Sequence, residues 1–452
     1  MQLNNFIYFF IFIWFLQLLP FFDQTWAIPT DIQILKNPSN PKRLQIRSPV
    51  HSAPIPSSHN PGRRSSTYGF LDKLPPITRP IWLHHKKPSG LKDLRTLIVI
   101  KEIGKGSFGS VLAVREPKPP SKTYAVKTCQ GVVNNVITCY NEIQFLNEMS
   151  KHLTPLASSF MAFPMAYWGQ KFSSNKGQFN ILMELQPYGS LDKVVIKYPL
   201  GNIHGISYAM SFEELRFIGS ELFAGINHIH STNVLHSDIK PENILVTSSG
   251  HLAINDFGVS RMFENVGQRN GGKFGRLSGS HDFLPPEALD STYSHYDSTV
   301  DYWAGVITLL KLRYPLFKTV HGLDEIQKED TSPGANEFFD FVRVMLQEIP
   351  QRRLAFGVDG FSNIQTHPFF RGVDWELVES RKNPIPATFK KILRTIPPLR
   401  ASTFKPLRTL AQELRQNSLK QQAGHIGKGI AAAGVILGAT GLLGIVNAAA
   451  SN

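Results

Sequence analysis

Cysteine is scarce in this chain, which has 452 residues but only Cys129 and Cys139 as cysteines. Two residues cannot supply the disulfide framework on which small secreted folds depend. We therefore expect both to be small structural thiols. The fold must rest on a hydrophobic core instead, and a hydrophobic fraction of 42% is ample for a large one.

Motifs for nucleic-acid binding are also absent. The sequence has no zinc-ligand spacing and no aromatic-rich RNA-binding motif, so we expect no specific nucleic-acid partner. It contains no internal repeat, which argues against a repeat array. It also has no Asn-x-Ser/Thr sequon, although secreted proteins of this length often carry one.

Acidic residues are scarce on both sides of the chain's centre. Residues 28–95 contain 12 Lys and Arg against 3 Asp and Glu, and residues 371–420 contain 11 against 4. Residues 96–370 have a balance of −2, so the net charge of +14 belongs to the flanks. Basic flanks attract anionic membranes or acidic partners without specificity, but most are simply solvated.

Long apolar runs occur only near the two ends. The first spans about 17 residues, Phe6–Phe22, and is followed by Thr25-Trp26-Ala27, with small residues where a signal peptidase cleaves. We predict a signal peptide over residues 1–27 and entry into the secretory pathway. An N-terminal membrane anchor is the alternative, because the run nearly reaches spanning length.

The second run, Ile430–Ala450, has 21 residues without a charge and is long enough to cross a bilayer as a helix. Gly434 and Gly438 have the spacing that lets membrane helices approach closely. The run is rich in Gly and Ala, so its hydrophobicity is modest. Membrane contact, a hairpin packed on protein and a removable lipid-anchor signal all remain open.

The composition divides the chain into five segments. We expect a signal peptide or anchor at 1–27, a basic Pro/Ser-rich linker at 28–95, a folded domain at 96–370, a basic tail at 371–425 and a Gly/Ala-rich apolar tail at 426–452. The basic tail is expected to be helical around Leu410–Leu414.

A glycine-rich loop follows the strand predicted at Leu97–Ile103. Gly104, Gly106 and Gly109 would let the backbone lie close to phosphates and donate N–H groups to them. The spacing alone is weak evidence, because dinucleotide-binding folds share it. Here a second strand, starting at Val111, follows instead of a helix. The loop is thus predicted to be a hairpin lid, with Val111 against an adenine ring.

A lysine ends the next predicted strand. Lys127 would point inward and bind phosphate oxygens, and it needs a carboxylate to position it. Glu142 lies beside a helical apolar stripe made by Tyr140, Ile143, Leu146 and Met149. We predict Glu142 as the partner, and Glu148, on another face of that helix, is the alternative.

The next strand, Ile181–Leu185, runs into a break at Gln186–Ser190. A strand that feeds an open linker can offer backbone N–H and C=O groups to a purine edge. Met183 would then limit the pocket behind the ring.

The strongest signal is His236-Ser237-Asp238-Ile239-Lys240-Pro241-Glu242-Asn243, followed by Asp256-Phe257-Gly258. Phosphoryl transfer needs a carboxylate that orients the acceptor, a cation near the moving group and Mg²⁺ ligands. Asp238 and Lys240 can supply the first two. Asn243 and Asp256 have the oxygen donors that Mg²⁺ prefers, and the hairpin between them returns Asp256 to the loop.

At these motifs the chain resembles the eukaryotic protein kinase family, over Leu97–Phe370, some 60% of its length. Lys240-Pro-Glu-Asn243 and Ser280 look like the Ser/Thr branch, and His367-Pro-Phe-Phe370 is similar to the end of AGC-group kinase domains. No clear AGC hydrophobic motif follows. The resemblance implies an α+β, two-lobed protein-kinase fold, with a small N-lobe β-sheet carrying one helix and a larger helical C-lobe.

The resemblance also implies a set of functional residues and two structural pairs. Glu287 would pair with Arg353, and Asp301 would hold the catalytic loop from behind. ATP and Mg²⁺ are the implied cofactors. The expected catalytic residues are Asp238, Lys240, Lys127 and Glu142, the metal ligands are Asn243 and Asp256, and the nucleotide-binding residues are Ile103, Gly104, Gly106, Gly109, Val111, Ala125, Lys127, Met183, Glu184 and Leu185.

One position departs from the family pattern. Ser237 replaces the arginine that usually precedes the catalytic aspartate and that binds a phosphate on the activation segment. The sequence therefore suggests an enzyme that is active without this switch, or one that a partner controls.

The leading hypothesis is a Ser/Thr protein kinase that acts in, or is exported through, the secretory pathway. Protein substrates with a basic residue near the acceptor are the expected partners, and the oligomeric state is open. A pseudokinase scaffold that binds nucleotide or partners without catalysis is the alternative, and a small-molecule kinase is a third hypothesis. The intact Lys127, Asp238, Asn243 and Asp256 argue against the scaffold.

Overall fold

The computed structural model describes residues 74–83, 91, 93–106, 109–119, 121–173, 175–203, 206–262, 272–273, 277, 279–290, 295–317, 323–397 and 408–416. These all belong to the compact unit that begins at Leu74. The predicted signal peptide and the Gly/Ala-rich apolar tail lie outside the described residues. Within the described ranges, no helix combines the length and apolar character needed to span a bilayer.

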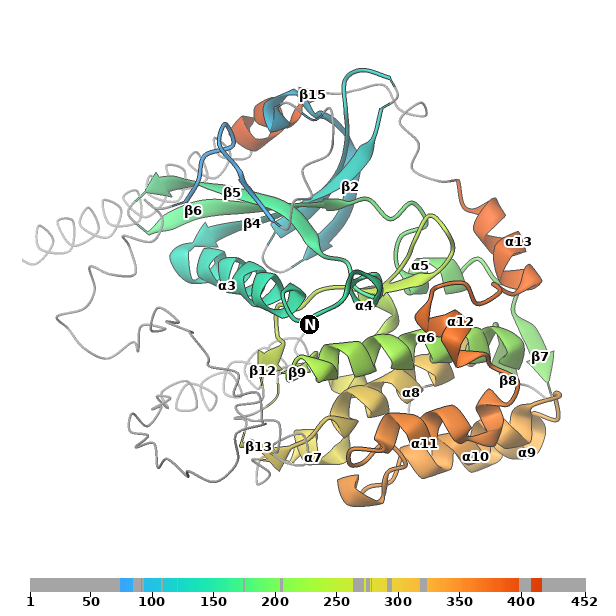
Figure 1. Cartoon of the computed structure of the whole chain (residues 1–452). Coiled ribbons are helices and arrows are strands. Elements are labelled where there is room, and N and C mark those ends of the chain that lie inside the picture. The colour runs from blue at the N-terminus through green and yellow to red at the C-terminus, as the bar shows by residue number, and fades with distance from the viewer. Residues whose placement is uncertain are drawn as a thin grey trace, which may run out of the picture. The chain divides into compact units, whose positions relative to one another are not determined.

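An antiparallel sheet forms the small lobe (Figure 1). Its strand order is β1-β5-β6-β4-β3-β2-β15, and one long helix, α3 (Val133–Ser150), packs beside it. The strands are β1 (Ile81–Trp82), β2 (Ile98–Gly106), β3 (Gly109–Arg115), β4 (Thr123–Val132), β5 (Pro164–Ser173), β6 (Lys176–Glu184) and β15 (Arg408–Thr409).

Alternating side chains give this sheet two buried faces. Leu112 and Val114 of β3 join one hydrophobic cluster, which also holds Leu97, Val99 and Trp168. Ala113, between them in sequence, joins a separate cluster on the other face. The first cluster is the core of the lobe, whereas the second lines the side that faces the catalytic residues.

The large lobe is mainly helical and is built around α6 (Phe212–Ser231) and α8 (Thr299–Arg313), both mostly buried. A capping box starts α6, because the Ser211 hydroxyl accepts from the Glu214 amide and the Glu214 carboxylate accepts from the Ser211 amide. The other helices are α4 (Pro155–Ser158), α5 (Leu191–Val195), α7 (Pro286–Leu289), α9 (Leu323–Glu329), α10 (Ala335–Met345), α11 (Gly360–Thr366), α12 (Trp375–Glu379) and α13 (Ala387–Thr395).

Among the described residues, four short antiparallel strand pairs complete this lobe. The pair β10–β11 forms the hairpin predicted between Asn243 and Asp256. The pairs are β7 (Gly201–Ile203) with β8 (Ile206–Tyr208), β9 (Val234–Leu235) with β12 (Arg261–Met262), β10 (Ile244–Val246) with β11 (Leu252–Ile254), and β13 (Gly272–Lys273) with β14 (His295–Tyr296). The predicted α+β, two-lobed fold is therefore confirmed.

The segment before the domain contributes to the small lobe, although its composition suggested a linker up to residue 95. Strand β1 pairs with β5, and Leu83, Leu91 and Leu94 are buried. Sparse apolar residues among many Pro, His and Lys residues are sufficient to cover an exposed sheet edge. The linker prediction was therefore wrong for the described part of residues 74–95.

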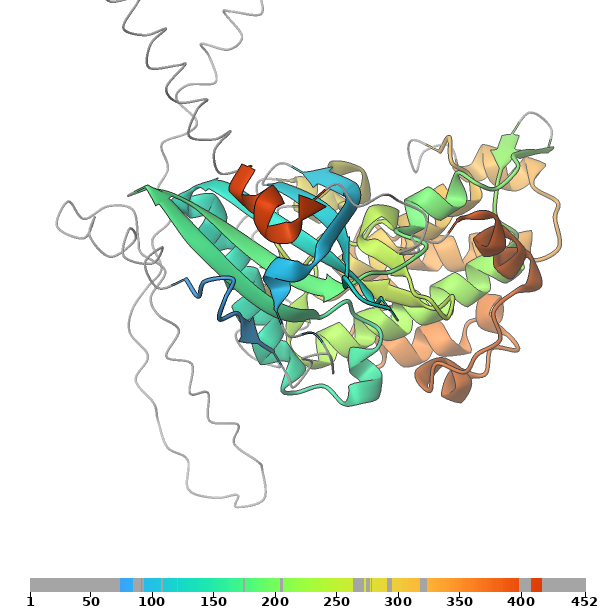
Figure 2. The ribbon, with the colours of Figure 1, turned by 90° about the horizontal axis from the view of Figure 1, so that it is seen from above.

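The basic tail also folds back onto the domain. In α13, Phe389 and Leu393 are buried in the core of the large lobe. Further along, β15 pairs with β2 and is followed by the helical residues 410–416 (Figure 2). Leu410 and Leu414 of this helix are buried in the small-lobe core. The described parts of the tail are thus structural, and they close the second edge of the sheet.

The two cysteines correct another expectation. Cys129 of β4 and Cys139 of α3 form a disulfide, with their Cα atoms 6.5 Å apart, rather than two free thiols. Strand β4 ends at Val132 and α3 begins at Val133. The chain therefore turns sharply from strand to helix, which brings two residues ten positions apart face to face.

We expect Leu410→Ala to lower the free energy of unfolding by about 2–5 kcal/mol, because Leu410 is fully buried and its truncation leaves a cavity. Arg415→Ala, at an exposed position of the same helical segment, is the matched control. Denaturant unfolding measures both. Equal stability of the two variants would show that this segment does not belong to the core.

Candidate functional site

The glycine-rich loop is the turn of the β2–β3 hairpin, in which Gly106 pairs with Gly109. A side chain at position 109 is impossible, because a Cβ atom there would lie 1.6 Å from the carbonyl oxygen of Thr128 on β4. The loop thus lies between two strands, as predicted, and not at the start of a helix as in dinucleotide-binding folds.

Beneath this hairpin, strands β2, β3, β4 and β6 bring together an apolar surface. Five of the residues predicted to bind nucleotide belong to one cluster: Ile103, Val111, Ala125, Met183 and Leu185. Gly104 lies against Val111, since a Cβ at position 104 would be 3.7 Å from the valine methyl. Glu184 ends β6 with an exposed side chain, so its backbone is the part that can contact a ligand. Such a surface suits a flat ring.

Lys127 makes one of the contacts that join the two lobes. Its Nζ lies 3.1 and 3.0 Å from the two carboxylate oxygens of Glu142 on α3, and 2.9 Å from Oδ1 of Asp256. The predicted partner is therefore in place. Burial disfavours the ammonium, but the two carboxylates outweigh it and raise the pKa of Lys127 above its usual value. The lysine is charged at neutral pH.

Asp238 lies at the centre of the catalytic loop. Its Oδ2 accepts from Lys240 Nζ at 2.6 Å and from Asn243 Nδ2 at 2.9 Å, and its Oδ1 accepts from the Ser280 amide at 2.9 Å. Lys240 also reaches the Ser280 hydroxyl at 2.6 Å. Ser280 belongs to the activation segment, the part of the chain between Asp256-Phe257-Gly258 and Glu287. Asp238 and Lys240 therefore connect the catalytic loop to the activation segment.

Both aspartates are held in the ionised form. Burial alone would raise the pKa of Asp238, but the hydrogen bond and charge of Lys240, with the bonds from Ser280, keep it below the usual range. Burial of Asp256 is likewise outweighed by Lys127, which lowers the pKa of that carboxyl group. Asp238 is thus ready to accept a hydrogen bond or a proton.

The oxygens near Asp256 suit Mg²⁺. Asp256 offers a carboxylate and Asn243 an amide oxygen, and the amide of Asn255 donates to the carbonyl of Asn243 at 2.8 Å, which ties the two positions together. In the described ranges, no three His, Cys, Asp or Glu residues gather as a metal cage. A two-residue site of this kind fits a Mg²⁺ ion that also needs phosphate oxygens.

Asp301, at the start of α8, supports the catalytic loop from behind. Its carboxylate accepts from the amides of His236 at 2.7 Å and Ser237 at 2.8 Å, and it contacts His230 at 2.8 Å. Ser237 has a φ of 69°, a left-handed conformation that costs energy for a residue with a side chain. Asp301 therefore stabilises a strained turn directly before Asp238.

The Glu287–Arg353 pair that the resemblance implied is also present. Each guanidinium NH group lies 2.7 Å from one carboxylate oxygen, and both residues are buried. Sequence analysis did not identify His230 or the role of Ser280 in holding Lys240. Both contacts join residues distant in the chain, so no local spacing could reveal them.

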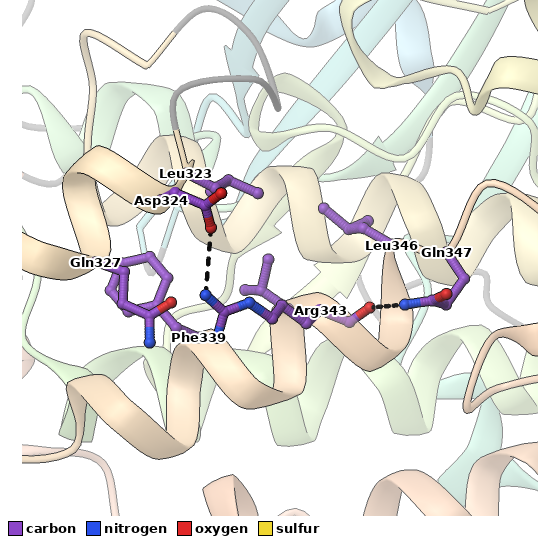
Figure 3. Close-up of a pocket in the computed structure, with 8 residues that line it drawn as sticks. Leu323, Asp324, Gln327, Phe339, Arg343, Leu346 and Gln347 are labelled. Atoms are coloured by element: carbon purple, nitrogen blue, oxygen red, sulfur yellow. Dashed lines mark hydrogen bonds and ion pairs between the residues drawn. The ribbon is translucent and has the colours of Figure 1, made fainter.

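A separate groove of about 360 Å³ lies between α9 and α10 (Figure 3). Arg343 crosses it to contact Asp324 at 3.2 Å, and both side chains are well exposed. None of the predicted functional residues lines this groove. We assign no function to it.

Comparison with known proteins identifies the class to which this fold and site belong. The family described as protein kinase domain matches residues 97–370. The chain therefore belongs to the protein kinase domain family.

Similar proteins lie in the Ser/Thr branch. The chain is 25% identical to the serine/threonine-protein kinase AtPK1/AtPK6 of Arabidopsis thaliana, over 66% of this chain and 60% of that protein. It is 28% identical to Sgk1-B of Xenopus laevis, over 78% and 73%, and 27% identical to the RAC serine/threonine-protein kinase of Drosophila melanogaster, over 66% and 46%. The resemblance to AGC-type Ser/Thr kinases is thus confirmed, although the match spans only about 60% of the length of the first of these relatives.

We expect Glu142→Gln to lower kcat at least about tenfold, because a neutral amide no longer holds the Lys127 ammonium in place. Glu148→Gln, on the same helix, is the matched control and tests the alternative partner. Phosphate transfer to a protein substrate measures both. A larger loss in the Glu148 variant would reverse the assignment.

Proposed function

We propose that this protein is a Ser/Thr protein kinase that transfers the γ-phosphoryl group of Mg·ATP to protein hydroxyls. The observation that carries the proposal is the contact of Asp238 with Lys240, Asn243 and Ser280. It places an ionised carboxylate, a cation and an amide ligand within one hydrogen-bonded group. This is the set that phosphoryl transfer requires.

Each residue has a distinct role in this mechanism. Asp238 accepts a hydrogen bond from the substrate hydroxyl and takes its proton as the oxygen bonds to the γ-phosphorus. The bond between that phosphorus and the bridging oxygen to the β-phosphate breaks in the same transfer, and ADP leaves. Lys240 neutralises charge that develops on the transferred group, and Lys127 orients the phosphates of the nucleotide. Asn243 and Asp256 would hold Mg²⁺, which neutralises phosphate charge when bound.

A pseudokinase scaffold is the alternative function. It would need a fold without a complete catalytic set. Lys127, Glu142, Asp238 and Asp256 are present and connected through the contacts above, which supports catalysis instead. A small-molecule kinase is less well supported, because the named relatives are protein kinases.

We expect Asp238→Asn to reduce phosphate transfer at least about a hundredfold while nucleotide binding stays within about threefold of wild type. The substitution removes the base but leaves Lys127 and Asp256 in place. Asp359→Asn, at an exposed position on the large lobe, is the control. Transfer and nucleotide affinity are measured separately. An Asp238 variant with more than about a tenth of wild-type transfer would exclude this role.

We also propose substrates with a basic residue close to the acceptor. Glu242 follows Lys240 and Pro241 in the catalytic loop, and its side chain is exposed. An exposed carboxylate beside the base can attract a cationic side chain of a bound peptide. Ser190 stands where basophilic relatives often have an acid, so the preference should be modest.

We expect a peptide library to show a basic preference two residues before the acceptor, and Glu242→Gln to weaken it by roughly threefold to tenfold. Glu213→Gln, an exposed acid at the start of α6, is the control and should leave the preference unchanged. A wild-type enzyme without any basic preference would contradict this proposal.

We propose that the protein enters the secretory pathway and is then exported or associated with a membrane. The support is the apolar run Phe6–Phe22 followed by Ala27, together with the Cys129–Cys139 disulfide, because disulfides persist in oxidising compartments. The lack of sequons and the limited ATP outside cells would suit a protein that is exported to act within another cell. The apolar tail is proposed as a weak membrane contact.

We expect sequencing of the mature N-terminus to begin at Ile28, because Ala27 ends the predicted cleavage site. A chain truncated at Gln422 should still be exported, while any membrane-bound fraction becomes soluble. Retention in the cytosol with Met1 intact would contradict the signal peptide. Equal solubility of the full-length and truncated chains would show that the tail is not an anchor.

A further inference from the structure

We infer that the Cys129–Cys139 disulfide is a positioning element of the kinase site, which holds Glu142 against Lys127. The disulfide joins the same strand and the same helix as this ion pair. The inference rests on the proposed kinase function and adds two positioning residues to it.

The geometry places the two links side by side. Lys127 and Cys129 are two positions apart on β4, so their side chains lie on the same face of the strand. Cys139 and Glu142 are three positions apart on α3, which puts them on the same face of the helix, about one turn apart. The covalent and ionic links therefore run in parallel between β4 and α3.

The two links differ in strength and surroundings. Both cysteines are almost fully buried, at 1% and 3% exposure, whereas the Lys127 side chain is 24% exposed. The Glu142 side chain is only 7% exposed, so salt screens the pair weakly, but the partners of an ion pair can still separate, whereas those of a covalent bond cannot. The disulfide thus limits how far α3 can move from the sheet at Cys139 when nucleotide binds or leaves.

The first half of the helix is also held by packing, because Val133 and Val136 are buried and the Tyr140 ring packs edge-on against Phe179. Its first turn contains no acidic residue and its last turn no basic residue, so side chains do not offset its dipole there. Its buried Leu146 and Met149, in the second half, belong to the core of the large lobe. The disulfide therefore adds a covalent link to β4 in the first half of α3, one turn before Glu142.

Ser237 gives a reason why this kinase would need the disulfide. In place of a cation, the catalytic loop has a serine whose hydroxyl is buried, and its Oγ has no hydrogen-bond partner among the described residues. A neutral hydroxyl cannot order the activation segment by binding a phosphate as an arginine does. A permanent link between β4 and α3 can keep Glu142 in place without that signal.

The test uses the full chain and compares Cys129→Ala, Cys139→Ala and the double variant, each with Glu142 intact and with Glu142→Gln. Alanine avoids a buried, unpaired hydroxyl. Alkylation and mass spectrometry of the unreduced wild-type protein first establish the bond. Thermal unfolding sets an assay temperature at which every variant is folded, and Leu393→Ala, a buried position in α13, controls for a general loss of stability.

With Glu142 intact, we expect all three cysteine variants to lose the same factor in kcat, at least about threefold, because either substitution breaks the one bond. In the Glu142→Gln background the cysteine substitutions should have no further effect. Hydrogen exchange of residues 133–150 should accelerate in all of them, and Leu393→Ala should keep its kcat.

Three results would overturn the inference: a loss below about threefold, a loss of equal size in the Glu142→Gln background, or free thiols in the wild-type protein. Failure of the proposed function has a different signature, because wild-type protein with an intact disulfide would then transfer no phosphate at all. In that case the rate of hydrogen exchange in α3 alone decides whether the disulfide restrains the helix.

Discussion

The position of the Lys127 ammonium between two carboxylates is the interaction on which the rest of the site depends. Glu142 comes from the helix of the small lobe and Asp256 from the large lobe, so a single cation connects three elements. Removal of the lysine would leave two buried or half-buried carboxylates close to each other, which is unfavourable. The two lobes and the site are therefore stabilised by the same charge.

A second set of contacts fixes the catalytic loop from the opposite side. Asp301 accepts from the backbone of His236 and Ser237, while Asp238 binds Lys240 and the amide of Ser280. His236 also packs against Phe257, with ring centroids 4.8 Å apart, next to Asp256. Thus the base, the metal-binding aspartate and the activation segment are connected through neighbouring hydrogen bonds and ring contacts.

The parts of the site that could be predicted from sequence are those encoded locally. Asp238, Lys240 and Asn243 lie in one short segment, so the loop brings them together whatever surrounds it. The apolar stripe of α3 showed which face is buried, and hence that Glu142 points inward. The hairpin β10–β11 is short enough to return Asp256 to Asn243 without help from distant residues.

Contacts between distant residues could not be predicted in this way. The sequence of the basic tail does not indicate that β15 pairs with β2. This pairing depends on the course that the chain takes through the large lobe before it returns to the small one. The His230–Asp301 contact joins residues 71 positions apart. The disulfide was missed for another reason, since the exact end of β4 and the start of α3 decide whether Cys129 and Cys139 face each other.

The most direct test of the central claim is the rate of γ-phosphate transfer to a protein substrate by Lys127→Met, compared with the wild-type chain. Methionine keeps much of the length of the side chain but removes the charge that Glu142 and Asp256 share. We predict a loss of at least about tenfold in kcat. A variant that transfers phosphate within about tenfold of the wild-type rate would contradict the account.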